Sequence, residues 1–164
     1  MKNRYIEILK QTYYNLSKKD LKNFEDVIGK EGLGTCKPRF HLFAFIFGWF
    51  YLLYRKMVTE SFGVLITALL VGYILAYAKI HPVLVLGIMV IINSFLSGFC
   101  YYFLYLNKLD RDIENCGGVH NPDIECIKKK AKPNIWYVIG AVVFILILIW
   151  PIIFSMITGH DISK

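Results

Sequence analysis

Three long segments of this chain contain no Asp, Glu, Lys, Arg or His: residues 61–78, 83–106 and 135–157. Each approaches or exceeds the roughly 20 apolar residues that a helix needs to cross a bilayer. A helix of a soluble bundle keeps a polar face, and these segments have none, which argues against that class. The sequence therefore predicts an all-α integral membrane protein. We expect its transmembrane helices at about 60–78, 83–107 and 135–157.

The composition agrees with a membrane protein. Hydrophobic residues make up 56% of the chain and aromatic residues 16%, which is more than globular proteins usually contain. The first apolar segment begins only at Phe40, after a long charged stretch, so we expect no cleaved signal peptide. The net charge of +7 is interpreted as a signal for membrane orientation, because no nucleic-acid motif accompanies the basic residues.

A fourth apolar segment, residues 40–54, is crowded with aromatic side chains and is called the aromatic block below. Eight of its fifteen residues are Phe, Trp or Tyr. As a helix it would reach about 22 Å, short of a hydrocarbon core of roughly 30 Å. We therefore predict a re-entrant or interfacial helix that packs against the transmembrane helices and can bend at Gly48. The expected interfacial anchors are Trp49, Tyr54, Arg55 and Lys56, whose two basic side chains can extend to the membrane surface.

The distribution of Lys and Arg supports this topology. If the aromatic block does not cross the membrane, seventeen basic residues lie on one side and two on the other. If it crosses, the two sides hold eleven and eight. Because cytoplasmic loops are enriched in Lys and Arg, the first arrangement is favoured. We expect a cytoplasmic N-terminus, three crossings, a cytoplasmic loop over 107–134 and a C-terminus on the opposite side.

Residues 1–35 are predicted to form a pair of cytoplasmic amphipathic helices, followed by a membrane domain over 36–164. Ile6, Leu9, Tyr13 and Leu16 recur at helical spacing. Ser17, with Asp20 three residues later, is predicted to cap the second helix. Three uses of the apolar faces stay open: contact with anionic headgroups, docking on the chain's own cytoplasmic loop, or binding of a partner protein. In that loop, Asn121-Pro122-Asp123 is predicted to start a further helix, with Asn121 as its cap.

The run Phe45-Ile46-Phe47-Gly48-Trp49-Phe50-Tyr51-Leu52-Leu53-Tyr54-Arg55-Lys56-Met57 resembles the signature of a known family. This is the domain of unknown function 2628 family of small bacterial polytopic membrane proteins, in which an aromatic, Gly-containing block runs into Tyr-Arg-Lys-Met. The similarity is specific over about residues 40–63. It implies an integral protein of the bacterial inner membrane, and it implies no activity and no catalytic residues. In that membrane, the topology deduced from the Lys and Arg distribution puts the C-terminus in the periplasm.

Polar and small residues cluster at one level of the second transmembrane segment. They are Asn93, Ser94, Ser97 and Gly98. Ser94 and Gly98 have the spacing of small residues that lets helices approach closely, and Asn93 can donate hydrogen bonds between helices. We predict a helix-packing role for this cluster. A transport path is the alternative, and the lack of ionisable groups in the segment argues against it.

Potential metal ligands lie in the polar regions, at Cys36, His41, Cys116, His120 and Cys126. Zinc takes such ligands, but their spacing lacks the short Cys-x-x-Cys arrangement of structural sites. We therefore expect reduced thiols and no cofactor, and keep a zinc site with Cys36, Cys116, His120 and Cys126 as ligands as an alternative. No phosphate-binding loop, catalytic triad or intramembrane carboxylate pair is present, so no catalytic residue is assigned.

Three hypotheses about function follow. The favoured one is an accessory or assembly subunit of a larger membrane complex, because the chain is small and has packing motifs without catalytic motifs. The first alternative is a homo-oligomeric channel or transporter component, and the second is a metal-binding sensor or enzyme. The expected partners are the lipid bilayer, anionic headgroups near the Lys128 to Lys132 run, and either a membrane protein or a second copy of this chain.

Overall fold

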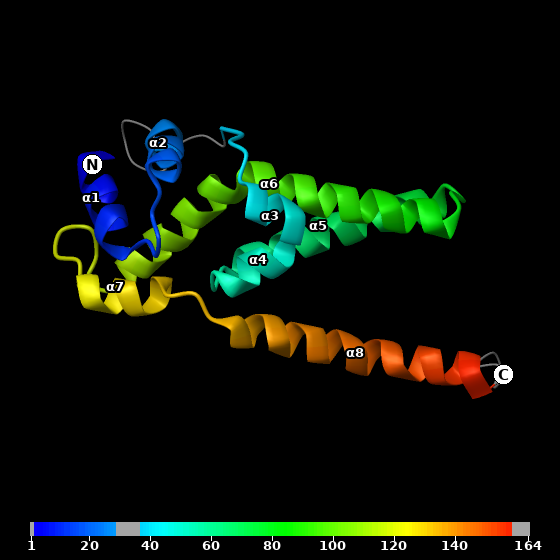
Figure 1. Cartoon of the computed structure of the whole chain (residues 1–164). Helices are drawn as coiled ribbons and strands as arrows, with labels where there is room; N and C mark the ends of the chain where they lie inside the picture. The colour runs from blue at the N-terminus through cyan, green and yellow to red at the C-terminus, as the bar shows by residue number, and fades with distance from the viewer. Residues whose placement is uncertain (1, 29–36, 159–164) are drawn as a thin grey trace.

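The computed structural model describes the backbone of residues 2–28 and 37–158 and the side chains of these residues up to Ile147. This part of the chain is helical and contains no strand (Figure 1). Its helices are α1 (Lys2–Thr12), α2 (Lys18–Val27), α3 (Leu42–Phe47), α4 (Trp49–Tyr54), α5 (Val58–Tyr77), α6 (Pro82–Glu114), α7 (Ile124–Ala131) and α8 (Ile135–Thr158).

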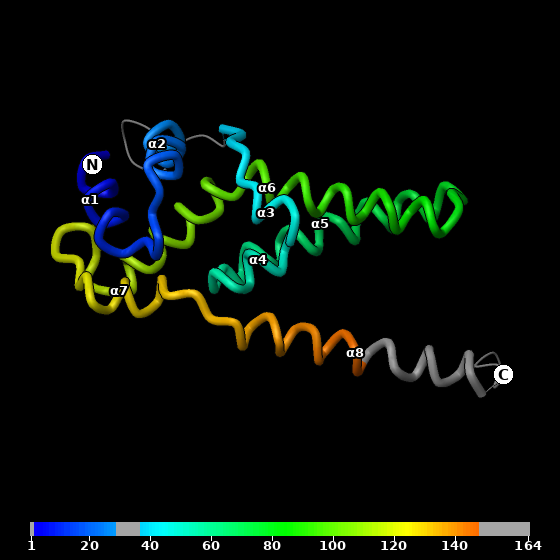
Figure 2. Tube along the Cα trace, viewed as in Figure 1, coloured from blue at the N-terminus to red at the C-terminus, as the bar shows by residue number. Residues whose placement is uncertain are grey.

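Three helices of the described part are long and apolar enough to cross a membrane, which confirms the predicted number. They are α5, α6 and the span Ile124–Ile147, which includes the first part of α8. α5 and α6 form an antiparallel hairpin, and Figure 2 shows them side by side to its closed end. The hairpin turns at Lys79, whose φ is +58°, and α6 begins with Pro82, which lacks the N–H that the first turn leaves unpaired.

The aromatic block forms two short helices, α3 and α4, rather than one. They meet at Gly48, whose φ of +52° lies where a residue with a Cβ is disfavoured. α3 lies along the middle of α6 (Figure 1). Just before α3, the backbone N–H groups of Arg39 and His41 donate to the carbonyls of Phe99 and Gly98 on α6. The segment is therefore tied to α6 by backbone as well as by side chains.

The N-terminal helices pack against the second half of α6 and against α7, and together these elements are called the cap. Figure 1 shows α6 leaving α5 and continuing toward α1, α2 and α7. One continuous core fills the cap and reaches the aromatic block. Its largest fully buried side chains include Leu9, Phe24, Leu52, Tyr101, Tyr102, Tyr105, Leu109, Ile113 and Ile127. The amphipathic faces of α1 and α2 therefore dock on the chain's own loop, which is one of the three uses predicted from the sequence.

Local capping follows the sequence at α2 and departs from it at α7. The Ser17 hydroxyl accepts from the backbone N–H of Asp20 at 3.0 Å, as predicted. At α7 the prediction of Asn121 as the cap is wrong, because Asp123 is the N-cap and accepts from the N–H of Cys126. Gly117 and Gly118, both with positive φ, reverse the chain between α6 and α7. The helix starts later than predicted because an Asp side chain can satisfy its free N–H groups.

Candidate functional site

Arg55 follows the last residue of α4 and is buried in a cage of tyrosine rings. Its side chain lies in the protein interior, with only 3% of the residue exposed. The guanidinium carbon lies 4.2 Å from the ring centroid of Tyr13 and 5.3 Å from that of Tyr105. The hydroxyls of Tyr13 and Tyr101 lie 3.0 Å apart and share a hydrogen bond. Cation–π contacts thus join the end of α1, the end of α4 and the middle of α6.

The charge of Arg55 has no acidic partner among the described side chains. The ion pairs found there join other residues, and the Nε and Nη2 atoms of Arg55 are buried without a hydrogen bond of normal geometry. Asp20 is a nearby acid, but its oxygens accept from the hydroxyls of Tyr102 and Ser17, each at 2.6 Å. A guanidinium is always protonated in proteins. Among the described side chains, the positive charge in the cage is therefore uncompensated.

A cavity of about 360 Å³ adjoins this cage. Its walls come from the α1–α2 connection, the first turn of α2, the aromatic block with Arg55, and Pro133 in the α7–α8 connection. The lining residues are Tyr13, Tyr14, Asn15, Asp20, His41, Phe43, Tyr51, Tyr54, Arg55 and Pro133. Rings form most of the wall, and Arg55 and Asp20 supply its charges. A cavity of this size holds a small molecule or the headgroup of a lipid.

His41 lies in the same wall as a neutral side chain. Its Nδ1 atom accepts from the backbone N–H of Ala44 and so caps α3. Burial lowers the pKa of His41 to about 4, against an opposing effect of Asp20. Because Nδ1 is the acceptor in a neutral ring, Nε2 carries the proton. His41 therefore supplies a hydrogen-bond donor without a charge at neutral pH.

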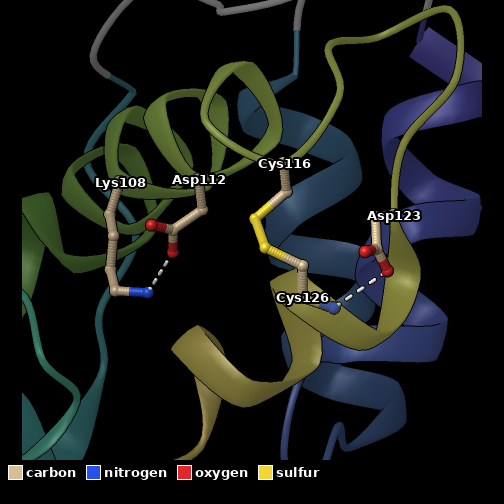
Figure 3. Close-up of a disulfide and its surroundings, with 5 residues drawn as sticks. All are labelled: Lys108, Asp112, Cys116, Asp123 and Cys126. Carbon is tan, nitrogen blue, oxygen red and sulfur yellow. Dashed lines mark hydrogen bonds and ion pairs between the residues drawn. A yellow bond between two sulfur atoms is a disulfide. The ribbon is translucent and has the colours of Figure 1, made fainter.

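A second cavity, of about 650 Å³, is rich in lysine and lies beside α7 and the start of α8. Its lining residues are Lys56, Lys108, Asp112, Cys126, Lys129, Lys130 and Tyr137. Lys108 forms an ion pair with Asp112 at 2.6 Å, which Figure 3 shows. Burial lowers the pKa of the Lys108 ammonium, and the ion pair opposes this shift. With four lysines and one carboxylate, the cavity suits an anionic group.

The structure joins Cys116 and Cys126 by a disulfide between the end of α6 and α7 (Figure 3). This differs from the expected reduced thiols, and it leaves neither sulfur available as a zinc ligand while the bond is present. Closing a loop of this size contributes about 3 kcal/mol to stability by the chain-entropy estimate. Such bonds are rare in the cytoplasm, so the thiol state of this loop depends on the side of the membrane it occupies.

The other zinc candidates do not complete a site in the described part of the chain. Cys36 lies outside the described residues. The backbone carbonyl of His120 accepts from Arg4, which ties the α6–α7 loop to α1. The described residues contain no group of three or more His, Cys, Asp and Glu side chains with metal-binding geometry.

The polar cluster of α6 faces the aromatic block. A Cβ on Gly98 would lie 2.7 Å from the Cβ of Phe45, and one on Gly48 would lie 3.4 Å from the Asn93 amide. Ser97 is fully buried, and its hydroxyl donates to the Asn93 Oδ1 atom at 3.4 Å. Ser94 is partly buried on the same helix. Three of the four predicted packing residues thus lie at the contact between α6 and the block.

The four expected interfacial anchors have different environments. Trp49 and Tyr54 are partly buried, and Lys56 is partly buried with its ammonium donating to the carbonyl of Lys129. Arg55, expected to extend to the membrane surface, lies instead inside the tyrosine cage. The sequence could not reveal this, because the tyrosines that surround Arg55 come from distant segments.

An apolar groove of about 580 Å³ separates α8 from α4 and α5. Its walls include Trp49 and Leu53 of α4, Phe62 and Leu69 of α5, and Ala141 of α8. Within the described part, the only helix against which α8 packs is α4, and Figure 1 shows α8 apart from the α5–α6 hairpin. One potential transmembrane helix therefore lacks a helical neighbour along most of its length.

The chain matches a family of proteins of unknown function. The family model described as "Protein of unknown function (DUF2628)" matches residues 15–111. The matched region begins before α2 and ends within α6, so it includes the aromatic block, Arg55, Tyr101 and Tyr105 but not Tyr13, α7 or α8. No curated protein and no solved structure matches the chain.

Proposed function

The chain belongs to the DUF2628 family of proteins of unknown function, and we propose that it is an accessory or assembly subunit of a larger membrane complex. Within this proposal, α8 presents a binding face to a transmembrane helix of another protein. The observation that carries it is the isolation of α8, which packs on α4 but on neither α5 nor α6 in the described part.

The residues along α8 favour a helix as the occupant of this groove. Helices associate in bilayers where small side chains let their backbones approach closely. α8 has Gly140, where a Cβ would meet nothing within 4 Å, followed by Ala141 in the groove wall. Phe62, Leu69 and Phe144 supply apolar surface on both sides. A partner helix would thus approach α8 closely at Gly140 and pack against the apolar side chains on both sides of the groove.

The homo-oligomeric channel is supported less well. Its path would need Asn93, Ser94 and Ser97 to face a shared pore. Ser97 is fully buried and Asn93 contacts the Gly48 turn, so both are engaged within the chain. A packing role accounts for these two residues without a second copy.

We further propose that the aromatic block does not cross the membrane. α1 and α2 precede the block, whereas α7 and the end of α6 follow the α5–α6 hairpin, and all four share one core. A shared core supports placing residues 2–28 and 106–131 on the same side of the bilayer, because segments on opposite faces of a membrane cannot pack into one core. Two crossings by α5 and α6 satisfy that condition, which leaves the block re-entrant or interfacial.

The proposed orientation has the cap in the bacterial cytoplasm, where Cys116 and Cys126 would be kept as reduced thiols instead of the disulfide, and α8 leading to the periplasm. It is supported by the lysine-rich cavity, since Lys56, Lys108, Lys129 and Lys130 gather where α8 begins. At a cytoplasmic interface these side chains would bind anionic phospholipid headgroups. The cavity shares Tyr137 with the apolar groove. A protein surface suited to lipid headgroups therefore adjoins one suited to hydrocarbon chains.

Site-specific photo-crosslinking in native membranes tests the accessory role. A benzophenone side chain replaces Ala141, in the groove wall, or Val142, exposed outside it. We expect one crosslinked protein of defined mass from Ala141 and little from Val142. Ile145→Trp, which fills the groove, should weaken this product severalfold, whereas Val143→Trp should not. Lipid adducts alone from both positions would contradict the proposal, and a product of twice the chain's mass would favour the homo-oligomer.

A further inference from the structure

The charge of Arg55 needs a counter-charge that the described side chains do not supply. A buried ion is strongly unfavourable unless it is paired and hydrogen-bonded. The ring faces of Tyr13 and Tyr105 offset part of this cost. The Tyr105 hydroxyl interacts with Arg55, but the Nε and Nη2 atoms are buried without a hydrogen bond of normal geometry. An acceptor from outside the chain would complete the environment.

We propose that the cavity beside Arg55 binds an oxyanion, a phosphate or carboxylate group, through the guanidinium of Arg55. The two unpartnered nitrogens, Nε and Nη2, form one edge of the guanidinium. Their N–H bonds point the same way and match two oxygens of a carboxylate or phosphate, which is the bidentate arrangement that Arg makes and Lys cannot. Arg55 also lines the cavity, so a group bound there meets this side chain.

Other donors in the wall suit the same ligand. The cavity is lined by the hydroxyl-bearing rings of Tyr13 and Tyr51 and by His41, whose Nε2 carries a proton. Asp20 is the one carboxylate of the lining, and its oxygens already accept from Tyr102 and Ser17. Its negative charge disfavours a ligand with a second anionic group. The site therefore suits one oxyanion group on a body with apolar surface.

Two sources can supply such a group. Phe43 and Tyr54, in the cavity wall, belong to the aromatic block, which the proposed topology puts at the membrane interface. A phospholipid could place its phosphate near Arg55 while its chains stay in the bilayer. A soluble phosphate monoester also fits a cavity of about 360 Å³. The lipid source depends on the proposed topology, whereas the soluble source does not.

Thermal unfolding of the full chain in a neutral detergent tests the site with three probes. The probes are glycerol phosphate, dioctanoyl phosphatidic acid, and dioctanoylglycerol, which has the same chains without phosphate. We expect at least one phosphorylated probe to raise the Tm saturably and dioctanoylglycerol to have no comparable effect. Stabilisation by glycerol phosphate identifies a soluble ligand, and stabilisation by phosphatidic acid alone identifies a lipid. This comparison uses the wild-type chain and needs no variant.

Two substitutions then assign the effect to Arg55. Arg55→Lys keeps the charge but loses the paired N–H edge, and Arg55→Met keeps the apolar stem. Both should weaken the response at least tenfold in probe concentration, and Lys10→Gln, at an exposed position that lines neither cavity, should not. The proposal is overturned if no phosphorylated probe raises the Tm of the wild type, if dioctanoylglycerol acts equally, or if Arg55→Met responds like the wild type.

Discussion

Phe24→Ala is expected to destabilise the cap by about 3 to 5 kcal/mol, the usual cost of removing a fully buried phenylalanine. Phe24 is 0% exposed, and its ring centroid lies 5.3 Å from that of Tyr13 and 4.9 Å from that of Tyr102. Through these ring contacts, α2 packs against both the end of α1 and α6. A cavity at this place removes packing from three helices at once, and the small N-terminal pair has no other large core.

The measurement is the rate at which trypsin cleaves the lysines of α1 and α2 in the detergent-purified chain. The rate follows the population of the opened cap when opening is fast, so it should rise by two or more orders of magnitude. Tyr14→Ala is the control, because Tyr14 is 52% exposed and exposed sites rarely exceed about 0.5 kcal/mol. Equal cleavage of the two variants would mean that α1 and α2 do not dock on α6.

Gly98→Leu is expected to displace the aromatic block from α6. A Cβ at this position would lie 2.7 Å from the Cβ of Phe45 and 3.0 Å from its Cα, so the backbone of α3 itself must move. Overpacking of a core costs about 1 to 3 kcal/mol and sometimes more. We expect the upper end, because the hydrogen bonds from Arg39 and His41 to α6 are also strained.

Gly87→Leu is the matched control, since Gly87 lies on the same helix and a Cβ there meets nothing within 4 Å. The signal is the fluorescence of Trp49 in a chain with Trp136→Phe and Trp150→Phe, followed during thermal unfolding. Gly98→Leu should lower the Tm by several degrees and change the emission before unfolding. Gly87→Leu should do neither. If both variants behave alike, the contact between α3 and α6 is not a determinant of the fold.

The helices that could cross the membrane were predictable because length and lack of charge determine them. The runs without Asp, Glu, Lys, Arg or His coincide closely with α5, the first part of α6, and α8. The Ser17 cap was predictable for a similar reason, because its partner Asp20 is only three residues away. The membrane helices and the Ser17 cap are both determined by residues close together in the chain, so a single sequence is enough to predict them.

The features that were missed depend on residues far apart in the chain. Arg55 next to Lys56 is typical of an interfacial anchor, and only the tertiary fold brings Tyr13, Tyr101 and Tyr105 around it. The break of the aromatic block into α3 and α4 was predicted only as a possible bend at Gly48. The closeness of Cys116 and Cys126 depends on how the Gly117 and Gly118 turn reverses the chain.

The central claim is that the helices before the aromatic block and the loop after the α5–α6 hairpin lie on the same side of the membrane. Single cysteines are introduced as Lys10→Cys, Lys128→Cys and Lys79→Cys, all at exposed positions, in a chain without other cysteines. A membrane-impermeant maleimide is then applied to right-side-out and inside-out vesicles.

Lys10→Cys and Lys128→Cys should be labelled only in inside-out vesicles, and Lys79→Cys only in right-side-out vesicles. Labelling of Lys10→Cys and Lys128→Cys from opposite faces would contradict the account, because residues of one core cannot lie on two sides of a bilayer.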